Sequence, residues 1–148
     1  MNKIQTFNEL HFSGELLFLG NAWDLLSALT LEKVGFKAIG TTSWGIANSL
    51  GYADGELIDF NRHLEIIKNI AQNVKVPVSA DIEAGYGEDT QTIVDHVLRT
   101  ADVGVAGINN KNLLFFECFF LFFLFFSPSI CIPNSRSSQR GSFFPIGM

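Results

Sequence analysis

Two carboxylates stand close together in a glycine-rich segment of the chain. Asp81 and Glu83 follow the short, mostly apolar run 76–80 and precede Gly85 and Gly87. Side chains two residues apart on a strand point to the same face, so both carboxylates could bind one ligand. Because adjacent carboxylates repel each other, such a pair commonly holds a cation. The segment therefore indicates a cation site, and the alternative is an ordinary solvated loop.

The elements that must position this pair alternate along the first 110 residues. Short apolar runs predict strands at 16–20, 37–42, 76–81 and 103–109. The first of these runs is continuously apolar, which predicts a strand buried on both faces. Apolar residues at helical spacing predict helices near 4–11, 25–35, 60–74 and 91–101. The expected N-caps of the last three helices are Asn21 or Asp24, Asp59 and Thr90.

This alternation predicts an α/β fold with parallel strands, built from βαβ units. Polar and glycine residues gather after the strands, including the long connection 43–56, which favours a TIM (β/α)8 barrel. A barrel has eight strands and about 250 residues. Only four strands are expected before residue 110, so we predict a partial barrel, about half of one. A doubly wound open sheet is the alternative, although no G-x-G-x-x-G segment opens the first βα turn.

Charge and cysteine content argue against several function classes. Residues 1–112 hold 14 acidic side chains against 8 Lys and Arg, without a basic stripe, so we expect no nucleic-acid binding. They contain no cysteine, and therefore no disulfide framework and no thiolate metal site. The N-terminal residues lack a long apolar run after a charged start, so we expect no secretory signal and a cytoplasmic location.

Three segments, taken in order, resemble the isocitrate lyase/phosphoenolpyruvate mutase superfamily, and its phosphoenolpyruvate mutase-like branch in particular. They are 19–28 (LGNAWDLLSA) with 35–39, then 41–55 (TTSWGIANSLGYADG), then 78–87 (VSADIEAGYG), and the similarity continues through 104–109. The resemblance covers about three-quarters of the chain. It implies a magnesium-dependent, typically homo-oligomeric barrel. Such enzymes make or break C–C or P–C bonds in small 2-oxo or enolpyruvyl acids, through an enolate-like intermediate.

The resemblance also implies roles for individual residues. Asp81 and Glu83 match the family's Mg²⁺ site, where the metal acts as a Lewis acid, and Asp81 also faces the substrate. Thr42, Ser43 and Trp44 match the loop that binds the substrate carboxylate, although Ser43 replaces the family's common glycine. The alternative for these three residues is a strand end followed by a packing tryptophan.

Four further side chains receive weaker assignments. Asp54 matches a catalytic acidic residue on the family's gating loop, but without the resemblance it belongs to a simple Asp-Gly turn. His11 lies on the leading helix. His63 and His96 lie on predicted helices, away from the strand ends. We expect surface or packing roles for all three histidines.

The similarity to the family ends just after residue 109. Where the family supplies a further acidic pair, this chain reads Asn110-Lys111-Asn112, and a cation beside Mg²⁺ opposes metal binding. The later strands, the catalytic loop and the later substrate-binding arginine of the family have no counterpart. We therefore divide the chain into a barrel-like part, 1–112, and a tail, 113–148, and expect little or no turnover.

The tail differs sharply in composition from the rest of the chain. Residues 113–126 read LLFFECFFLFFLFF, and a Ser- and Pro-rich stretch follows. A membrane anchor is one interpretation, but a spanning helix needs about 20 apolar residues. A partner-binding extension is the second, and translated non-coding sequence is the third, which we favour. The competing functional hypothesis is accordingly a non-catalytic fragment that associates with a membrane or partner through this tail. An exposed run of this kind is also prone to aggregate.

Overall fold

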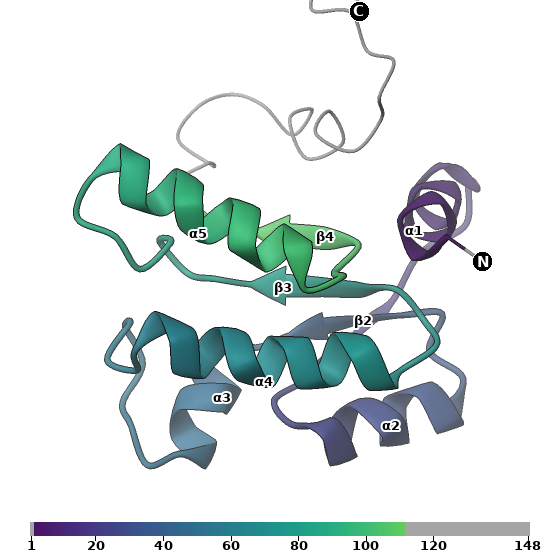
Figure 1. Ribbon diagram of the computed structural model, residues 1–148. Helices are drawn as coiled ribbons and strands as arrows, with labels where there is room; N and C mark the ends of the chain where they lie inside the picture. The colour runs from purple at the N-terminus through teal and green to yellow at the C-terminus, as the bar shows by residue number, and fades with distance from the viewer. Residues whose placement is uncertain (1, 112–148) are drawn as a thin grey trace, which may run out of the picture.

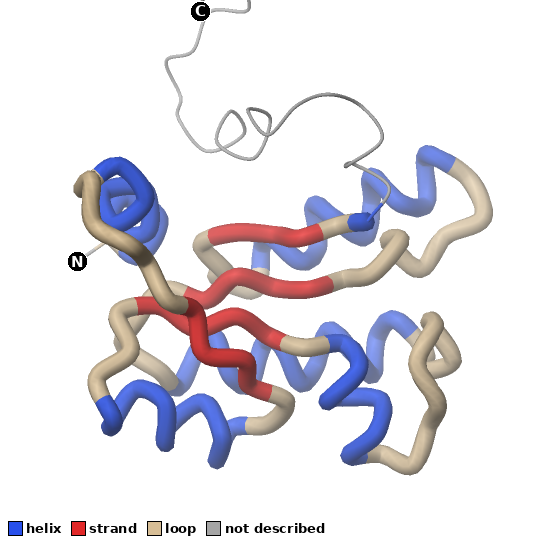
Figure 2. Tube along the Cα trace, turned by 180° about the vertical axis from the view of Figure 1, so that it is seen from behind, coloured by secondary structure: helices blue, strands red, loops and turns tan. Residues whose placement is uncertain are grey.

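The computed structural model describes residues 2–111, which form a four-stranded parallel sheet with helices packed on it (Figure 1). The elements in chain order are α1 (Lys3–Phe12), β1 (Leu19–Ala22), α2 (Leu25–Val34), β2 (Ala38–Thr41), α3 (Ser43–Ser49), α4 (Phe60–Asn73), β3 (Val78–Asp81), α5 (Thr90–Asp102) and β4 (Gly107–Asn109). Seen from behind, α2, α4 and α5 lie on one face of the sheet (Figure 2). Helix α1 lies near the end where the strands begin.

The winding of the sheet decides between the two predicted architectures. Its order is β1-β2-β3-β4, so each strand lies beside the strand that precedes it in the chain, and all three pairings are parallel. A doubly wound sheet reverses direction at a switch point and carries helices on both faces. Here the order runs in one direction, and α2, α4 and α5 share one face, as in a (β/α)8 barrel. The predicted partial barrel is confirmed.

Aspartates begin the three helices that cover the sheet. Asp24 and Asp59 cap α2 and α4, as predicted. The prediction for α5 is wrong by one residue, because its N-cap is Asp89 and Thr90 is already helical. The Asp89 side chain accepts a hydrogen bond from the Thr92 N–H at 3.0 Å, which satisfies one of the amides that have no partner within the helix.

The first strand departs from the sequence-based prediction. The strand is Leu19–Ala22, not 16–20, and its residues alternate between exposed and buried. The prediction of burial on both faces is therefore wrong. Leu16 and Phe18 are 79% and 68% exposed. The physical reason is that β1 lies at the edge of the described sheet, where α2 covers one face. By contrast, all four residues of the inner strand β2 are buried.

The predicted connection after β2 begins with a helix, α3, so that part of the prediction is wrong. Thr42 caps α3, and its Oγ1 accepts a hydrogen bond from the Gly45 N–H at 3.3 Å. Gly45 is buried, and a Cβ atom placed on it would lie 3.0 Å from the Cβ of Trp23. The missing side chain lets α3 approach the β1–α2 turn closely.

The core fills the space between the sheet and its helices. Helix α4 contributes most, through a buried face that comprises Phe60, His63, Leu64, Ile67, Ile70 and Ala71. Of these, Ile67, Ile70 and Ala71 belong to one buried cluster with strand residues that include Ile39, Val78 and Ala80. Burial of each large aliphatic side chain stabilises the fold by about 1.5–3 kcal/mol. The layer of α4 on β2 and β3 therefore holds the C-terminal strand ends in place.

The described part of the chain contains no helix that is both long and apolar enough to cross a membrane. The predicted tail, 113–148, lies outside the described residues, as does the boundary that we placed at residue 112.

Candidate active site

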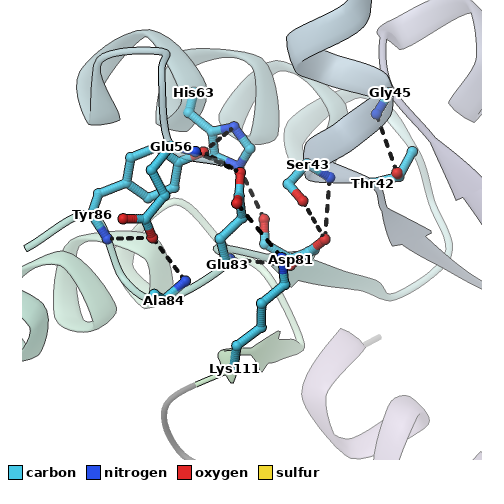
Figure 3. A network of polar contacts seen from close by, with 10 residues as sticks. All are labelled: Thr42, Ser43, Gly45, Glu56, His63, Asp81, Glu83, Ala84, Tyr86 and Lys111. Carbon is cyan, nitrogen blue, oxygen red and sulfur yellow. Dashed lines mark hydrogen bonds and ion pairs between the residues drawn. The ribbon is translucent and has the colours of Figure 1, made fainter. Parts of the chain in front are cut away.

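Polar side chains meet where β2 and β3 end (Figure 3). Asp81 is the last residue of β3, and its Oδ2 accepts hydrogen bonds from the Ser43 hydroxyl at 2.7 Å and the Ser43 N–H at 3.2 Å. The Asp81 N–H in turn donates to Thr41 Oγ1 at 2.9 Å. Ser43 begins α3 directly after β2, so the parallel register of the two strands brings these groups together. Asp81 is thereby held in one orientation.

The turn after β3 is built around the same carboxylate. Asp81 Oδ1 accepts a hydrogen bond from the Glu83 N–H at 3.1 Å. Glu83 and Tyr86 adopt left-handed backbone angles, with φ of 50° and 57°, and Gly85 has a φ of 101°. Residues other than glycine rarely adopt these angles, and they cost about 1–3 kcal/mol where they occur. Two such residues in one turn are typical of a functional loop.

Glu83 is a buried carboxylate with several partners. Its side chain is 4% exposed. Its Oε1 accepts hydrogen bonds from the Tyr86 hydroxyl at 3.3 Å and the Glu56 N–H at 3.4 Å. Its Oε2 lies 3.6 Å from Lys111 Nζ, which forms an ion pair with it. Such partners are needed because an isolated buried carboxylate is very costly in free energy.

His63 belongs to this network, so the prediction that it lies away from the strand ends is wrong. It is fully buried, and its Nε2 lies 2.9 Å from the Asp81 carbonyl oxygen. Because a carbonyl oxygen only accepts, Nε2 carries the proton and donates it. Burial lowers the pKa of His63, which favours the neutral ring. The spacing of Phe60, His63, Ile67 and Ile70 along one helical face was the signal for burial.

Tyr86 links His63 to Glu83. Its hydroxyl lies 3.3 Å from His63 Nδ1 and 3.3 Å from Glu83 Oε1. Burial is the main cause that raises the pKa of Tyr86, and the charge of Glu83 adds to it, so the phenol keeps its proton. His96 also lies at this loop, with Nδ1 2.8 Å from the Gly85 carbonyl oxygen and its ring stacked on Phe60. His96 therefore has the expected packing role, but the prediction that it lies away from the strand ends is wrong.

Glu56 lies in the connection between α3 and α4, residues 50–59, and contacts the loop after β3. Its Oε1 accepts hydrogen bonds from the backbone N–H groups of Ala84 at 2.7 Å and Tyr86 at 3.0 Å. Glu56 thereby joins two loops that are about 30 residues apart in sequence. Asp54, the predicted catalytic residue, is exposed in the same connection. Nothing in the local sequence distinguishes Glu56 from Asp54, because the contact depends on the tertiary fold.

The three residues predicted to bind a substrate carboxylate have different environments. Ser43 is buried and donates to Asp81, whereas Thr42 caps α3. Trp44 is 59% exposed at the start of the same helix. Ser43 is therefore the one that the fold brings to the acidic pair, through hydrogen bonds. Their part in substrate binding stays a prediction.

The donor chemistry of the pair fits Mg²⁺. No group of three or more His, Cys, Asp or Glu side chains within residues 2–111 is placed to hold a metal ion. Mg²⁺, however, keeps several waters and needs only one or two protein carboxylates. The oxygens of Asp81 accept three hydrogen bonds, and a carboxylate has about four acceptor positions, which leaves one position for a cation. Glu83 is the second candidate ligand, and Lys111 is already paired with it.

Comparison with known proteins agrees with this geometry. The family model for phosphoenolpyruvate phosphomutase matches residues 7–111. An uncharacterized protein of Mycobacterium tuberculosis is 39% identical over 107 residues, which are 72% of this chain and 40% of that protein. Phosphonopyruvate hydrolase of Variovorax sp. (strain Pal2) is 31% identical over 87 residues, 59% of this chain and 30% of that protein.

Solved structures lead to the same family. A phosphonopyruvate hydrolase, crystallised in complex with oxalate and Mg²⁺, superposes with a TM-score of 0.69 and 28% identity, covering 73% of this chain and 38% of that one. Phosphoenolpyruvate phosphomutase from Streptomyces platensis subsp. rosaceus gives a TM-score of 0.68 and 26% identity, over 71% and 36% of the two chains. The chain spans at most 40% of the length of the curated relatives named here. It belongs to the phosphoenolpyruvate phosphomutase family, within the phosphoenolpyruvate mutase/isocitrate lyase superfamily.

Proposed function

We propose that this chain forms the magnesium- and carboxylate-binding part of an enzyme that acts on a small 2-oxo or enolpyruvyl acid. The reaction is the making or breaking of a C–C or P–C bond through an enolate-like intermediate. The observation that carries the proposal is the orientation of Asp81, which three hydrogen bonds hold at the end of β3, beside the second carboxylate of Glu83. The complex of a related hydrolase with oxalate and Mg²⁺ supports the class of ligand.

In this proposal, Asp81 and Glu83 hold the metal, and Asp81 also faces the substrate. When bound, Mg²⁺ supplies positive charge that stabilises an enolate-like oxyanion. The Ser43 hydroxyl and N–H orient the Asp81 carboxylate, and His63 fixes the backbone carbonyl of the same residue. Tyr86 orients Glu83 through its hydroxyl. Pre-set side chains of this kind reduce the reorganisation that ligand binding requires.

The remaining assignments complete the proposal. Thr42, Ser43 and Trp44 contribute to the site of the substrate carboxylate, and Asp54 acts as a catalytic group on the connection between α3 and α4. We further propose a cytoplasmic enzyme that works as a homo-oligomer. Because the chain spans at most 40% of the curated relatives named above, we expect little turnover from it alone.

A thermal-shift experiment tests the proposal on the full 148-residue chain. We expect oxalate, which resembles a planar enolate, to raise the melting temperature by several degrees in the presence of Mg²⁺ and not in its absence. A ligand at about 100 times its dissociation constant stabilises a protein by about 2.7 kcal/mol. Asp81→Asn should abolish the shift. The control is Asp95→Asn, an exposed aspartate that pairs with Arg99 at 3.7 Å on α5. A shift that persists in Asp81→Asn would contradict the assignment.

A further inference from the structure

A cation from the chain itself lies beside the acidic pair. Lys111 follows β4, and its ammonium nitrogen is 3.6 Å from Glu83 Oε2. The backbone N–H of Lys111 also donates a hydrogen bond to the Glu83 carbonyl oxygen. These two contacts, one of the backbone and one of the side chain, fix where the ammonium group can reach. Because Lys111 directly follows the sheet and its backbone is bonded to Glu83, its side chain is held within reach of this carboxylate.

The two carboxylates of the pair are stabilised in different ways. Asp81 accepts hydrogen bonds from uncharged groups, namely the Ser43 hydroxyl and two backbone amides. Glu83 has a charged partner in Lys111, together with neutral donors on its other oxygen. The charge available to an incoming cation is therefore concentrated on Asp81, while the charge of Glu83 is already balanced.

The exposure of the two partners shows which one can move. The Glu83 side chain is 4% exposed, whereas that of Lys111 is 57% exposed. An ammonium group on a flexible four-carbon stem can turn towards solvent at little cost, whereas a buried glutamate cannot leave its site without extensive rearrangement. The ion pair can therefore open by movement of Lys111 alone.

We propose that Lys111 is a tethered counter-ion that competes with a divalent cation for Glu83 and so lowers the Mg²⁺ affinity of the site. The inference rests on the proposed function, which assigns the metal to Asp81 and Glu83. For Glu83 to hold a divalent cation, the ammonium group would have to leave it, because the like charges of the cation and the lysine repel each other. Lys111 thus determines how readily the acidic pair accepts a divalent cation.

Titration of the full chain with Mg²⁺ alone, followed by calorimetry, tests this inference. Lys111→Gln removes the charge and keeps the backbone hydrogen bond to Glu83. Because a positive charge beside the site repels the cation, we expect Mg²⁺ to bind about tenfold more tightly once that charge is removed. Lys111→Glu should bind at least as tightly as Lys111→Gln, and Lys111→Arg, which keeps the charge, should bind like the wild type. The matched control is Lys37→Gln, which breaks the exposed pair with Glu15 at 3.4 Å and should change nothing.

A second readout separates this role from a purely structural one. Without metal, Lys111→Gln should melt at a lower temperature than the wild type, because Glu83 loses its charged partner. Saturating Mg²⁺ should then raise its melting temperature by more than it raises that of the wild type. A structural role would lower the melting temperature equally with and without Mg²⁺.

The possible outcomes distinguish this inference from the proposed function. Equal Mg²⁺ affinity of the wild type, Lys111→Gln and Lys111→Glu would overturn the role of Lys111 and leave the metal site standing. Absence of Mg²⁺ binding in all of these proteins would overturn both. If Lys111→Gln fails to fold, as judged by circular dichroism, the same titration of Lys111→Met, which keeps an unbranched stem without its charge, decides.

Discussion

The two ends of the same sheet use charged side chains for different purposes. Where the strands begin, Lys3 Nζ donates to the carbonyl oxygens of Ala71 and Val74 at 2.7 Å each, and so closes the C-terminal end of α4. Glu32 accepts hydrogen bonds from the backbone N–H groups of Lys75 and Val76 and so fixes the approach to β3. Charged groups at this end complete hydrogen bonds that the helix and the loop leave open.

Where the strands end, carboxylates hold the loop after β3 in place, and one of them is paired with a cation. The carboxylates of Asp81, Glu83 and Glu56 organise the loop 82–87, and Lys111 balances one of them. Left-handed backbone at Glu83 and Tyr86 adds strain at this end. This contrast agrees with the proposed function, in which one end of the sheet stabilises the fold and the other binds the ligand, as in barrels whose sites lie at the C-terminal strand ends.

The largest expected effect contrasts one glycine from each end. Gly85, after β3, has a φ of 101°, and a Cβ atom there would lie 2.7 Å from Ile93 Cγ2. Gly104, before β4, has a φ of 94°, and no heavy atom of residues 2–111 lies within 4 Å of such a Cβ. Gly85→Ala combines backbone strain with overpacking, so it should reduce the free energy of unfolding by about 3 kcal/mol. Gly104→Ala carries the strain alone, about 1–2 kcal/mol.

Urea denaturation of both variants measures this difference. Equal losses of unfolding free energy in the two variants would mean that the loop after β3 is no more tightly packed than the turn before β4. The two ends of the sheet would then not differ in packing.

The next effect concerns pH and His63. Burial lowers the pKa of His63 in the folded protein below its ordinary value of about 6.5, so the unfolded chain binds the proton more readily. The stability contributed by the neutral ring is therefore complete above about pH 6.5 and declines as the pH falls below it. We expect a loss of up to about 1 kcal/mol between pH 6.5 and 5.5, and His63→Gln should remove this slope. The free energy of unfolding at pH 7.5, 6.5 and 5.5 gives the result, with His11→Gln as the control.

A further effect of similar size comes from the end where the strands begin. Lys3→Met removes two hydrogen bonds to carbonyl oxygens of α4 and should reduce the free energy of unfolding by about 1 kcal/mol. The affinity for Mg²⁺ should not change, because the lysine lies at the far end of the sheet. A change in Mg²⁺ affinity, measured by calorimetry, would show that the two ends are coupled and would break the division proposed above.

Much of the fold could be predicted from the sequence, because it depends on local patterns. The apolar runs located the inner strands, and Asp24 and Asp59 marked the starts of two helices. The prediction failed for 16–20, because Leu16 and Phe18 precede the strand and are exposed in the described part of the structure. It also failed for α3. The polar and glycine residues of this helix are typical of a loop, and its start at the Thr42 N-cap was not recognised.

The candidate site was predicted only in part, for a physical reason. Asp81 and Glu83 are neighbours in sequence, so their spacing pointed to a shared ligand. Their partners Glu56 and His63 join them across 27 and 18 residues. Contacts at such separations depend on how α4 and the α3–α4 connection pack, which no local pattern encodes. The sequence showed that Lys111 replaces an acidic residue of the family, but its ion pair with Glu83 was not predicted.

The most direct test of the central claim is a calorimetric titration of Mg²⁺ into the full wild-type chain and into Asp81→Asn. We expect Mg²⁺ to bind the wild type and to bind Asp81→Asn at least about tenfold more weakly. The reason is that, among residues 2–111, Asp81 is the member of the pair without a charged partner. Binding of equal strength by both proteins would contradict this expectation, since the end of β3 would then not hold the cation.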